Sequence, residues 1–329
     1  MVNERFVSTA PIGQMAIDIL SSRAPVEISP STSQESVASL MKGTLGLICR
    51  AETYIDGRIL DAGQNLKVLG RPGVGYDSVD VAAASERGIP LIYAPVGGFA
   101  VAEWAMAAML ALAKRLIECN EMVKSDKWNQ RYSLELDDMT EKTLGIVGFG
   151  RIGRMVAKKA QAFGLEVLSF DPMIESDFMN QLEVKKVELD DLLAESHFVT
   201  LHSPLIPATA NMFGNEQFKM MRNDAFLINC ARGGLIDEGA LHEAINSQTI
   251  AGAGVDVLVD IKPDTNHRLI KNENIIVTPH TAFFSQEAVL ELEERAAGQV
   301  GDVLIGKIPE NIVNVELLKG NNLRADIKQ

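Results

Sequence analysis

Cysteine is scarce in this sequence, with three residues among 329, at positions 49, 119 and 230. No two of them have the C-x-x-C spacing, and no histidine lies at a metal-ligand interval from any of them. Neither a disulfide framework nor a zinc site is therefore expected. The chain is predicted to work without a metal in a reducing compartment, the cytoplasm.

An excess of positive charge and a long apolar run are also missing. The chain has 31 Lys and Arg against 44 Asp and Glu, and the net charge of −13 argues against nucleic acid and an acidic membrane surface as partners, because both select clustered cations. Residues 1–6 lack the apolar core of a signal peptide, and the most apolar segment, 101–112, contains Glu103 and is too short to span a bilayer. Neither a membrane nor a nucleic-acid partner is expected.

Short apolar strands alternate with helical patterns along most of the chain, which predicts an α/β fold with two doubly wound parallel sheets. Strands are predicted at 5–8, 26–28, 45–49, 66–69, 91–93, 143–147, 165–170, 184–187, 197–201, 225–229, 252–257 and 275–278. Helices are predicted at 12–22, 33–42, 56–62, 78–87, 99–115, 151–163, 189–195, 215–221, 237–247 and 285–306. The last helix is expected to return to the first domain, so that the second domain is inserted into it. Residues 319–329 are expected to form a loosely held tail, and no regulatory module is expected beyond residue 315.

The segment 143–154 carries the clearest binding motif. It begins as an apolar strand pattern, continues as Gly148-x-Gly150-x-x-Gly153 and runs into a helical pattern. In such a strand, turn and helix, the first glycine permits the tight turn, the second lets the backbone approach a pyrophosphate, and the third lets helix and strand pack closely. The phosphates would lie on the helix N-terminus. Because a glycine-rich turn can also serve packing alone, the context of the motif decides its interpretation.

Asp171 supplies that context. A second strand pattern, 165–170, ends at this residue, 18 positions after Gly153. An acid at this place accepts hydrogen bonds from the adenosine ribose hydroxyls and repels a 2′-phosphate. The sequence therefore predicts a dinucleotide site that selects NAD over NADP.

Two side chains after predicted strands suit hydride transfer to a 2-oxo acid. That reaction needs a cation beside the carboxylate and carbonyl, and a proton donor that titrates near neutral pH. Arg232 follows the strand 225–229 and precedes two glycines, and His280 follows the strand 275–278. A lone histidine is more often a satisfied core residue, but its place after a buried strand favours the functional interpretation. Of the five histidines, His280 is the one predicted to be catalytic.

Two further segments indicate binding surfaces. The loop 70–77 lies between a predicted strand and a predicted helix, so its backbone N–H groups can cradle a substrate carboxylate. The helix 99–115 has apolar residues almost all round, which predicts burial on most sides, between domains or between subunits. A homodimer built on this helix is expected.

Taken together, these motifs make the chain resemble the D-isomer-specific 2-hydroxyacid dehydrogenases, the family that includes phosphoglycerate, D-lactate and glyoxylate-type enzymes. The resemblance covers about residues 45–315 and rests on the segments 70–80 (GRPGVGYDSVD), 101–103 (VAE), 148–153, 201–205 (LHSPL), 229–237 (NCARGGLID), 254–257 (GVDV) and 278–281 (TPHT). It implies a Rossmann-type NAD-binding domain, 98–285, inserted into a smaller flavodoxin-like substrate-binding domain, 1–97 and 286–329.

The resemblance also implies roles for individual residues. Arg232 would orient the substrate carboxylate and polarise its carbonyl, His280 would be the general acid and base, and Asp256 would hold the nicotinamide carboxamide. Substrate contacts are implied for Arg50 at the substrate's distal end, for the amides of Val74 and Gly75, and for Arg232 and His280. The cofactor-binding candidates are Val101, Gly148, Gly150, Arg151, Ile152, Gly153, Asp171, His202, Ser203, Pro204, Thr209, Cys230, Ala231, Arg232, Asp256 and His280.

One position departs from the family pattern. Family members usually carry a Glu five residues after the Asp256 position, hydrogen-bonded to the catalytic histidine, and this chain has Ile261 there. The departure leaves two other functions open: a dinucleotide-binding sensor resembling a co-repressor, and a formate- or phosphonate-type dehydrogenase on the same scaffold. Because Arg232 and His280 are both present, the favoured interpretation is an NAD-dependent oxidoreductase for a small 2-oxo acid and its D-2-hydroxy acid.

Ile261 predicts an early alkaline limit for oxo-acid reduction. A carboxylate beside His280 would favour the imidazolium, whereas an apolar neighbour lets the ring lose its proton at lower pH. Ile261→Glu is therefore expected to move the alkaline limb of the pH–rate profile upward, and Asp260→Asn to leave it in place. A downward shift with Asp260→Asn alone would show that Asp260 does the work of the missing carboxylate.

Overall fold

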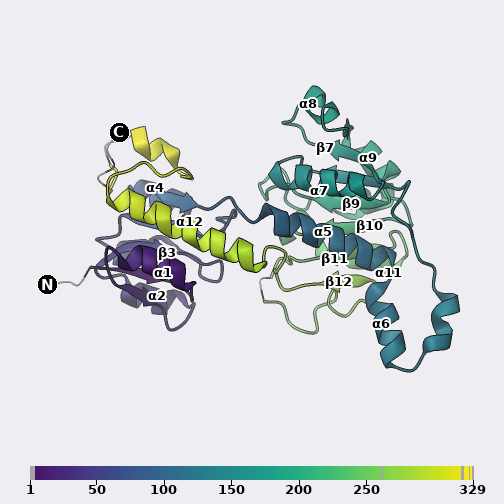
Figure 1. Ribbon diagram of the computed structural model, residues 1–329, viewed down its shortest axis with the longest axis horizontal. Helices are drawn as coiled ribbons and strands as arrows, with labels where there is room; N and C mark the ends of the chain where they lie inside the picture. Colours follow the sequence, from purple (N-terminus) through teal and green to yellow (C-terminus); the bar gives the residue numbers. More distant parts are fainter. Residues whose placement is uncertain (1–3, 261, 320–321, 326, 328–329) are drawn as a thin grey trace. The chain divides into compact units, whose positions relative to one another are not determined.

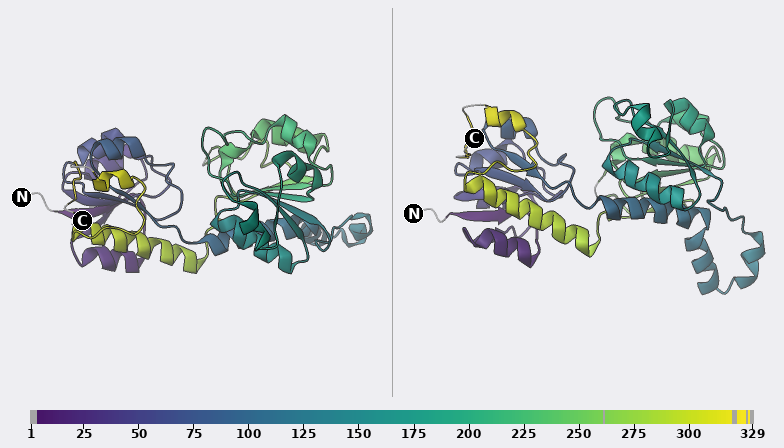
Figure 2. Two further views of the ribbon diagram at one scale, coloured as in Figure 1. Left: turned by 90° about the horizontal axis from the view of Figure 1, so that it is seen from above. Right: turned by 45° about the horizontal axis from the view of Figure 1, so that its top comes forward.

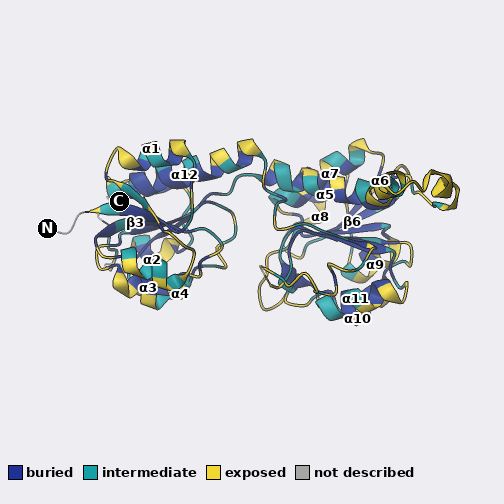
Figure 3. Ribbon diagram, turned by 90° about the horizontal axis from the view of Figure 1, so that it is seen from below, coloured by how far each residue is buried: buried dark blue, intermediate teal, exposed yellow. Residues whose placement is uncertain are grey.

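The computed structural model describes residues 4–260, 262–319, 322–325 and 327, so Ile261 lies outside the described residues. The chain forms two compact units, which we call unit 1 (Met1–Gly97 and Ser285–Gln329) and unit 2 (Gly98–Phe284). In each unit a parallel sheet is covered by helices on both faces (Figures 1 and 3). The predicted fold class, α/β with two doubly wound parallel sheets, is confirmed.

Unit 1 is built on a five-stranded sheet in the order β2-β1-β3-β4-β5, with all neighbours parallel, the order of flavodoxin-like folds. Its strands are β1 (Arg5–Ser8), β2 (Val26–Ile28), β3 (Thr44–Ile48), β4 (Val68–Arg71) and β5 (Leu91–Tyr93). Its helices are α1 (Gln14–Ser21), α2 (Gln34–Leu40), α3 (Gly57–Ala62), α4 (Val81–Glu86), α12 (Gln286–Leu304) and the 3-10 helix η3 (Val315–Lys319). The helices α1 and α12 cover one face of the sheet, and α2, α3 and α4 cover the other (Figure 3).

Unit 2 is built on a seven-stranded sheet in the order β12-β11-β10-β9-β6-β7-β8, again with all neighbours parallel. Its strands are β6 (Thr143–Val147), β7 (Glu166–Phe170), β8 (Lys185–Lys186), β9 (Phe198–Leu201), β10 (Phe226–Asn229), β11 (Gly252–Val255) and β12 (Ile275–Val277). Its helices are α5 (Gly98–Ala113), α6 (Leu116–Lys124), α7 (Arg151–Ala162), α8 (Ser176–Asn180), α9 (Leu189–Glu195), α10 (Asn215–Met220) and α11 (Glu238–Asn246), with 3-10 helices η1 (Trp128–Ser133) and η2 (Gly233–Leu235). The strand order reverses at β6, where doubly wound sheets bind their ligands.

Three helical elements of unit 2, α6, η1 and α8, were missed in the sequence, as was the three-residue 3-10 helix η2. The helix α6 and the turn η1 bury no residue and extend away from the sheet of unit 2 (Figure 2), so they have no apolar stripe facing a core. The helix α8 is a single short turn with one buried residue, Met179. Periodicity marks helices that bury one face, and these three do not.

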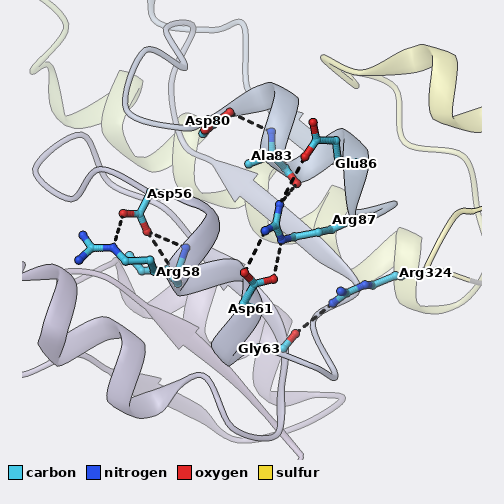
Figure 4. A network of polar contacts seen from close by, with 10 residues as sticks. Asp56, Arg58, Asp61, Gly63, Asp80, Ala83, Glu86, Arg87 and Arg324 are labelled. Carbon is cyan, nitrogen blue, oxygen red and sulfur yellow. Dashed lines mark hydrogen bonds and ion pairs between the residues drawn. The ribbon is translucent and has the colours of Figure 1, made fainter.

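In unit 1 an ion pair joins α3 to the residue that caps α4, and Arg324 connects the C-terminal segment to the residue after α3 (Figure 4). Arg87 donates to both carboxylate oxygens of Asp61, at 2.7 and 2.9 Å, and this pairing lowers the pKa of Asp61. Arg324 Nη1 donates to the Gly63 carbonyl at 3.2 Å, and its backbone N–H donates to the Gly88 carbonyl at 2.8 Å. The expectation of a loosely held tail is wrong for the described residues 322–325, because Ala325 is buried in the core beneath α1.

Across the described chain, we find no helix with both the length and the apolar character that crossing a membrane requires.

The close approach of α7 to β6 predicts a stability effect at Gly153. A Cβ there would lie 2.3 Å from the Gly148 carbonyl oxygen, which is backbone and cannot turn aside. Gly153→Ala is expected to destabilise the protein by about 1–3 kcal/mol in urea unfolding. The control is Gly298→Ala inside α12, where a Cβ meets nothing within 4 Å; it is expected to stabilise by about 0.5–1 kcal/mol. Equal effects of the two changes would contradict the packing argument.

Candidate active site

Three adjacent strands of unit 2 end in line at one edge of the sheet. The final residues of β10, β11 and β12, which are Asn229, Val255 and Val277, are partners in the parallel register. The segments that follow these strands carry Arg232, Asp256 and His280. The sheet therefore brings these three sequence-predicted residues to the same edge, where doubly wound folds bind their ligands.

The glycine turn after β6 leaves room for a phosphate group. Gly148 has φ +96°, a left-handed backbone that favours glycine, and a Cβ on it would lie 2.8 Å from the Ser203 hydroxyl. A Cβ on Gly150 would meet nothing within 4 Å, so the turn is open on that side. Gly150 is also the N-cap of α7 and makes no side-chain cap, which leaves the helix N-terminus to bind an anion. The turn thus fits the pyrophosphate of a dinucleotide.

Asp171, directly after β7, is held by backbone amides. Its Oδ2 accepts from the Phe149 N–H and its Oδ1 from the Met173 N–H, both at 2.8 Å. Each carboxylate oxygen can accept more than one hydrogen bond, so both keep acceptor capacity for ribose hydroxyls. The contact with Phe149 joins this carboxylate to the glycine turn, which is the arrangement expected at the adenosine end of NAD.

The turn that carries Arg232 is shaped by a buried asparagine. Asn229 is fully buried; its side chain accepts from the Ala231 N–H at 3.0 Å and donates to the Arg232 carbonyl at 2.9 Å. A Cβ on Gly233 would lie 2.2 Å from the Leu258 carbonyl carbon. The segment after β11, which contains Leu258, therefore packs directly on the segment after β10. Arg232 Nη1 donates to the Ala231 carbonyl at 2.7 Å. The Arg232 backbone is therefore fixed by Asn229 on one side and by Leu258 on the other.

The loop after β12 that carries His280 is bound to Asp256, whose side chain is 1% exposed. The Asp256 carboxylate accepts from the Thr281 and Ala282 N–H groups, each at 2.8 Å, and from the Thr278 hydroxyl. His280 has φ +55°, and its imidazole is exposed within unit 2 and packs edge-on to Phe283, with ring centroids 5.9 Å apart. Asp256 thus fixes the backbone of the loop that contains His280.

The loop after β9 contains three cofactor candidates with hydrogen bonds of their own. His202 Nε2 and the buried Thr200 hydroxyl lie 3.0 Å apart, and burial lowers the pKa of His202 to about 4, so this ring is neutral near pH 7. Ser203 donates to the Val147 carbonyl at 3.2 Å, which ties the loop to the glycine turn. Thr209 donates to the Pro204 carbonyl at 2.6 Å and accepts from the Ile206 N–H, so its hydroxyl shapes the loop itself.

The remaining cofactor candidates lie on α5, at the start of α7 and directly after β10. Val101 is half-buried on α5, and Arg151 and Ile152 are the first two residues of α7. Cys230 is buried, and burial raises the pKa of its thiol to about 12, so it is no nucleophile near neutral pH. In the described part of the chain, no group of three His, Cys, Asp or Glu residues could hold a metal ion.

The substrate candidates of unit 1 follow β3 and β4. Arg50 donates from Nη1 to Glu293 of α12 at 2.8 Å, and that buried carboxylate also accepts from the Gly13 N–H at 2.6 Å. Val74 and Gly75 lie in the turn after β4, with Val74 43% exposed. In unit 1 as described, their N–H groups donate to no other protein group, so they suit an anion from outside.

Three residues that organise these sites were missed in the sequence: Asn229, Thr278 and Glu293. Asn229 and Thr278 stand at strand ends, next to the candidates that they support. Glu293 is an acid between the apolar helix positions Leu292 and Ala296, a signal that marks a buried partner for a cation.

The chain is similar to proteins of known family. The family model described as "D-isomer specific 2-hydroxyacid dehydrogenase, NAD binding domain" matches residues 106–282. A D-3-phosphoglycerate dehydrogenase of Synechocystis sp. is 38% identical over 92% of this chain and 55% of its own length. The chain spans little more than half the length of the phosphoglycerate dehydrogenases that it matches.

Two other proteins match over nearly their whole length. A glyoxylate reductase of Korarchaeum cryptofilum is 36% identical over 87% of this chain and 88% of its own. The structure of D-lactate dehydrogenase from Aquifex aeolicus, complexed with NAD and lactic acid, superposes with a TM-score of 0.85 at 26% identity, over 94% of this chain and 99% of that one.

The neutral, half-buried His202 predicts a loss of stability in mild acid. Its pKa falls from 6.5 in the unfolded chain to about 4 in the folded protein, so its contribution is complete above pH 6.5 and is lost as the pH falls toward 4. Between pH 6.5 and 5 the loss should be about 1–2 kcal/mol. His202→Gln, which keeps a polar partner for Thr200, is expected to lack this part of the pH dependence in urea unfolding. The same loss in both proteins would show that His202 is not its source.

Proposed function

Because the chain belongs to the D-isomer specific 2-hydroxyacid dehydrogenase family, we propose that it interconverts a small 2-oxo acid and its D-2-hydroxy acid with NAD as the hydride carrier. The observation that carries the proposal is the shared sheet edge of unit 2, where Arg232 and His280 leave strands on either side of β11. The glycine turn after β6, with its open side at Gly150, supports the cofactor site in the same unit.

The chemistry of each group indicates its role in the reaction. Bound NADH would supply the hydride, which goes to C2 of the oxo acid. The Arg232 guanidinium has two parallel N–H donors that suit a carboxylate oxygen and the neighbouring carbonyl oxygen together. His280 donates a proton to the carbonyl oxygen in reduction and removes it from the hydroxyl in oxidation. The N–H groups of Val74 and Gly75 bind the carboxylate, which makes unit 1 the substrate-binding domain.

Arg50 is placed to influence which acid is used. Its guanidinium keeps further N–H donors beyond the one bound to Glu293, so it can meet a polar or anionic group at the substrate's distal end. The relatives differ at this end of the substrate, since one is named for glyoxylate and another for phosphoglycerate. A panel that contains both short and phosphorylated oxo acids distinguishes the two substrate classes.

A homodimer in the cytoplasm completes the proposal. The helix α5, predicted as its centre, buries eight residues within unit 2 and packs against α7. The exposed large apolar side chains that follow it suit a second copy of the chain: Leu116, Ile117, Val123, Trp128, Tyr132 and Leu136. Figure 3 shows α6 as a largely exposed segment. The cysteines Cys49, Cys119 and Cys230 are all free, which suits a reducing compartment.

The activity is tested by NADH oxidation, followed by absorbance, with glyoxylate, pyruvate, 2-oxobutyrate and 3-phosphohydroxypyruvate. Turnover with one of these acids, and formation of the D-hydroxy product, is expected. NADH binding without turnover of any oxo acid would instead favour the sensor function. Reduction of NAD⁺ by formate or a phosphonate, with no oxo acid turned over, would favour the other dehydrogenase chemistry.

Substitution of Arg232 tests the two-donor contact. A lysine ammonium cannot reproduce the planar pair of N–H donors, so Arg232→Lys is expected to lower kcat/KM nearly as far as Arg232→Ala, by about 100-fold or more. The dissociation constant of NADH should change little in both variants. If Arg232→Lys kept most of the activity, a bidentate contact would be ruled out.

Cofactor choice should follow Asp171. Its carboxylate would face a 2′-phosphate with like charge, so NADH is expected to bind at least tenfold tighter than NADPH, about 1.4 kcal/mol. Fluorescence titration of both cofactors measures this ratio. Asp171→Asn should narrow it, and equal affinities in the wild-type protein would refute the assignment.

A further inference from the structure

Asp256 is committed to the loop that carries His280. Three consecutive backbone N–H groups point to this one residue: His280 donates to its carbonyl oxygen, and Thr281 and Ala282 donate to its carboxylate, all at 2.8 Å. The hydroxyl of Thr278, which precedes His280 in the chain, donates to the same carboxylate. The protein's own carboxylate thus occupies a nest of successive N–H groups, the kind of concavity that binds anions.

The nest exists because His280 has a left-handed backbone. A positive φ of 55° is uncommon for a residue with a side chain, and it persists only where the surroundings hold it. The left-handed residue turns the following N–H groups to the same side, toward Asp256. The carboxylate is 1% exposed, so it depends on these hydrogen bonds as much as the loop depends on it.

We propose that Asp256 is the positioning residue for His280: its carboxylate fixes the left-handed backbone from which the imidazole is presented. This role is separate from a contact with the nicotinamide carboxamide. Such a contact would use Oδ2, which accepts only the Ala282 N–H among the described residues. The inference rests on the proposed function for the catalytic role of His280, but the state of the nest can be measured without activity.

Asp256→Asn tests the nest directly. An amide side chain has one acceptor oxygen, and its NH₂ group would face an N–H donor, so at least one of the two backbone bonds is lost. In the protein without cofactor, hydrogen exchange in peptides that cover 278–284 is expected to become at least tenfold faster. The matched control is Asp264→Asn, an exposed carboxylate that accepts from the Asn266 N–H in the preceding loop; it should leave exchange in these peptides unchanged. Unchanged exchange in Asp256→Asn would overturn the proposal, whether or not the protein is an active enzyme.

Kinetics then separate positioning of His280 from binding of the cofactor. Asp256→Asn is expected to lower kcat at least 30-fold, while the dissociation constant of NADH changes less than threefold. A rise in that constant that accounts for the whole loss of kcat/KM, with kcat retained, would overturn the positioning role in favour of the carboxamide contact.

Thr278→Val provides a second test that removes no charge. It deletes one hydroxyl donor to Asp256 while keeping the shape of the side chain, so the protein is expected to fold even if Asp256→Asn does not. We expect faster exchange in the same peptides and a three- to tenfold lower kcat, with the KM for NADH unchanged. Wild-type exchange and wild-type kcat in this variant would count against the proposal.

Discussion

Parallel pairing of every strand is the constraint on which this structure depends. Because all neighbours in both sheets run in the same direction, each strand ends at one edge of its sheet and a helix must carry the chain back. Residues that directly follow different strands are therefore gathered at that edge. Arg232, Asp256 and His280 are far apart in the sequence, yet they follow three adjacent strands.

Backbone N–H groups hold two carboxylates of the candidate site in unit 2. Asp171 accepts from Phe149 and Met173, and Asp256 accepts from Thr281 and Ala282. A hydrogen bond from the main chain fixes a carboxylate more rigidly than a long, flexible cationic side chain does, and it leaves charge available for a ligand. In unit 1, the Glu293 carboxylate accepts from a cationic side chain as well as from the main chain. Its donors are the Arg50 guanidinium and the Gly13 N–H.

The relatives support the family over most of this chain. The chain covers 88% of a glyoxylate reductase but 55% of a phosphoglycerate dehydrogenase, and both matches extend over most of this chain. The elements that carry the glycine turn, Arg232 and His280 all lie within 106–282, the range of the family model.

Much of this protein can be predicted from its sequence, for reasons of local chemistry. Alternating apolar strands and amphipathic helices predicted the two parallel sheets, because burial on both faces imposes those patterns. The glycine turn could be predicted because Gly148 has a positive φ and Gly153 has no room for a Cβ. By contrast, α6 and η1 bury nothing, so no periodicity marks them. The ion pair of Arg50 with Glu293 and the nest of Asp256 around His280 join residues that are distant in sequence, and only the tertiary structure brings such partners within hydrogen-bonding distance.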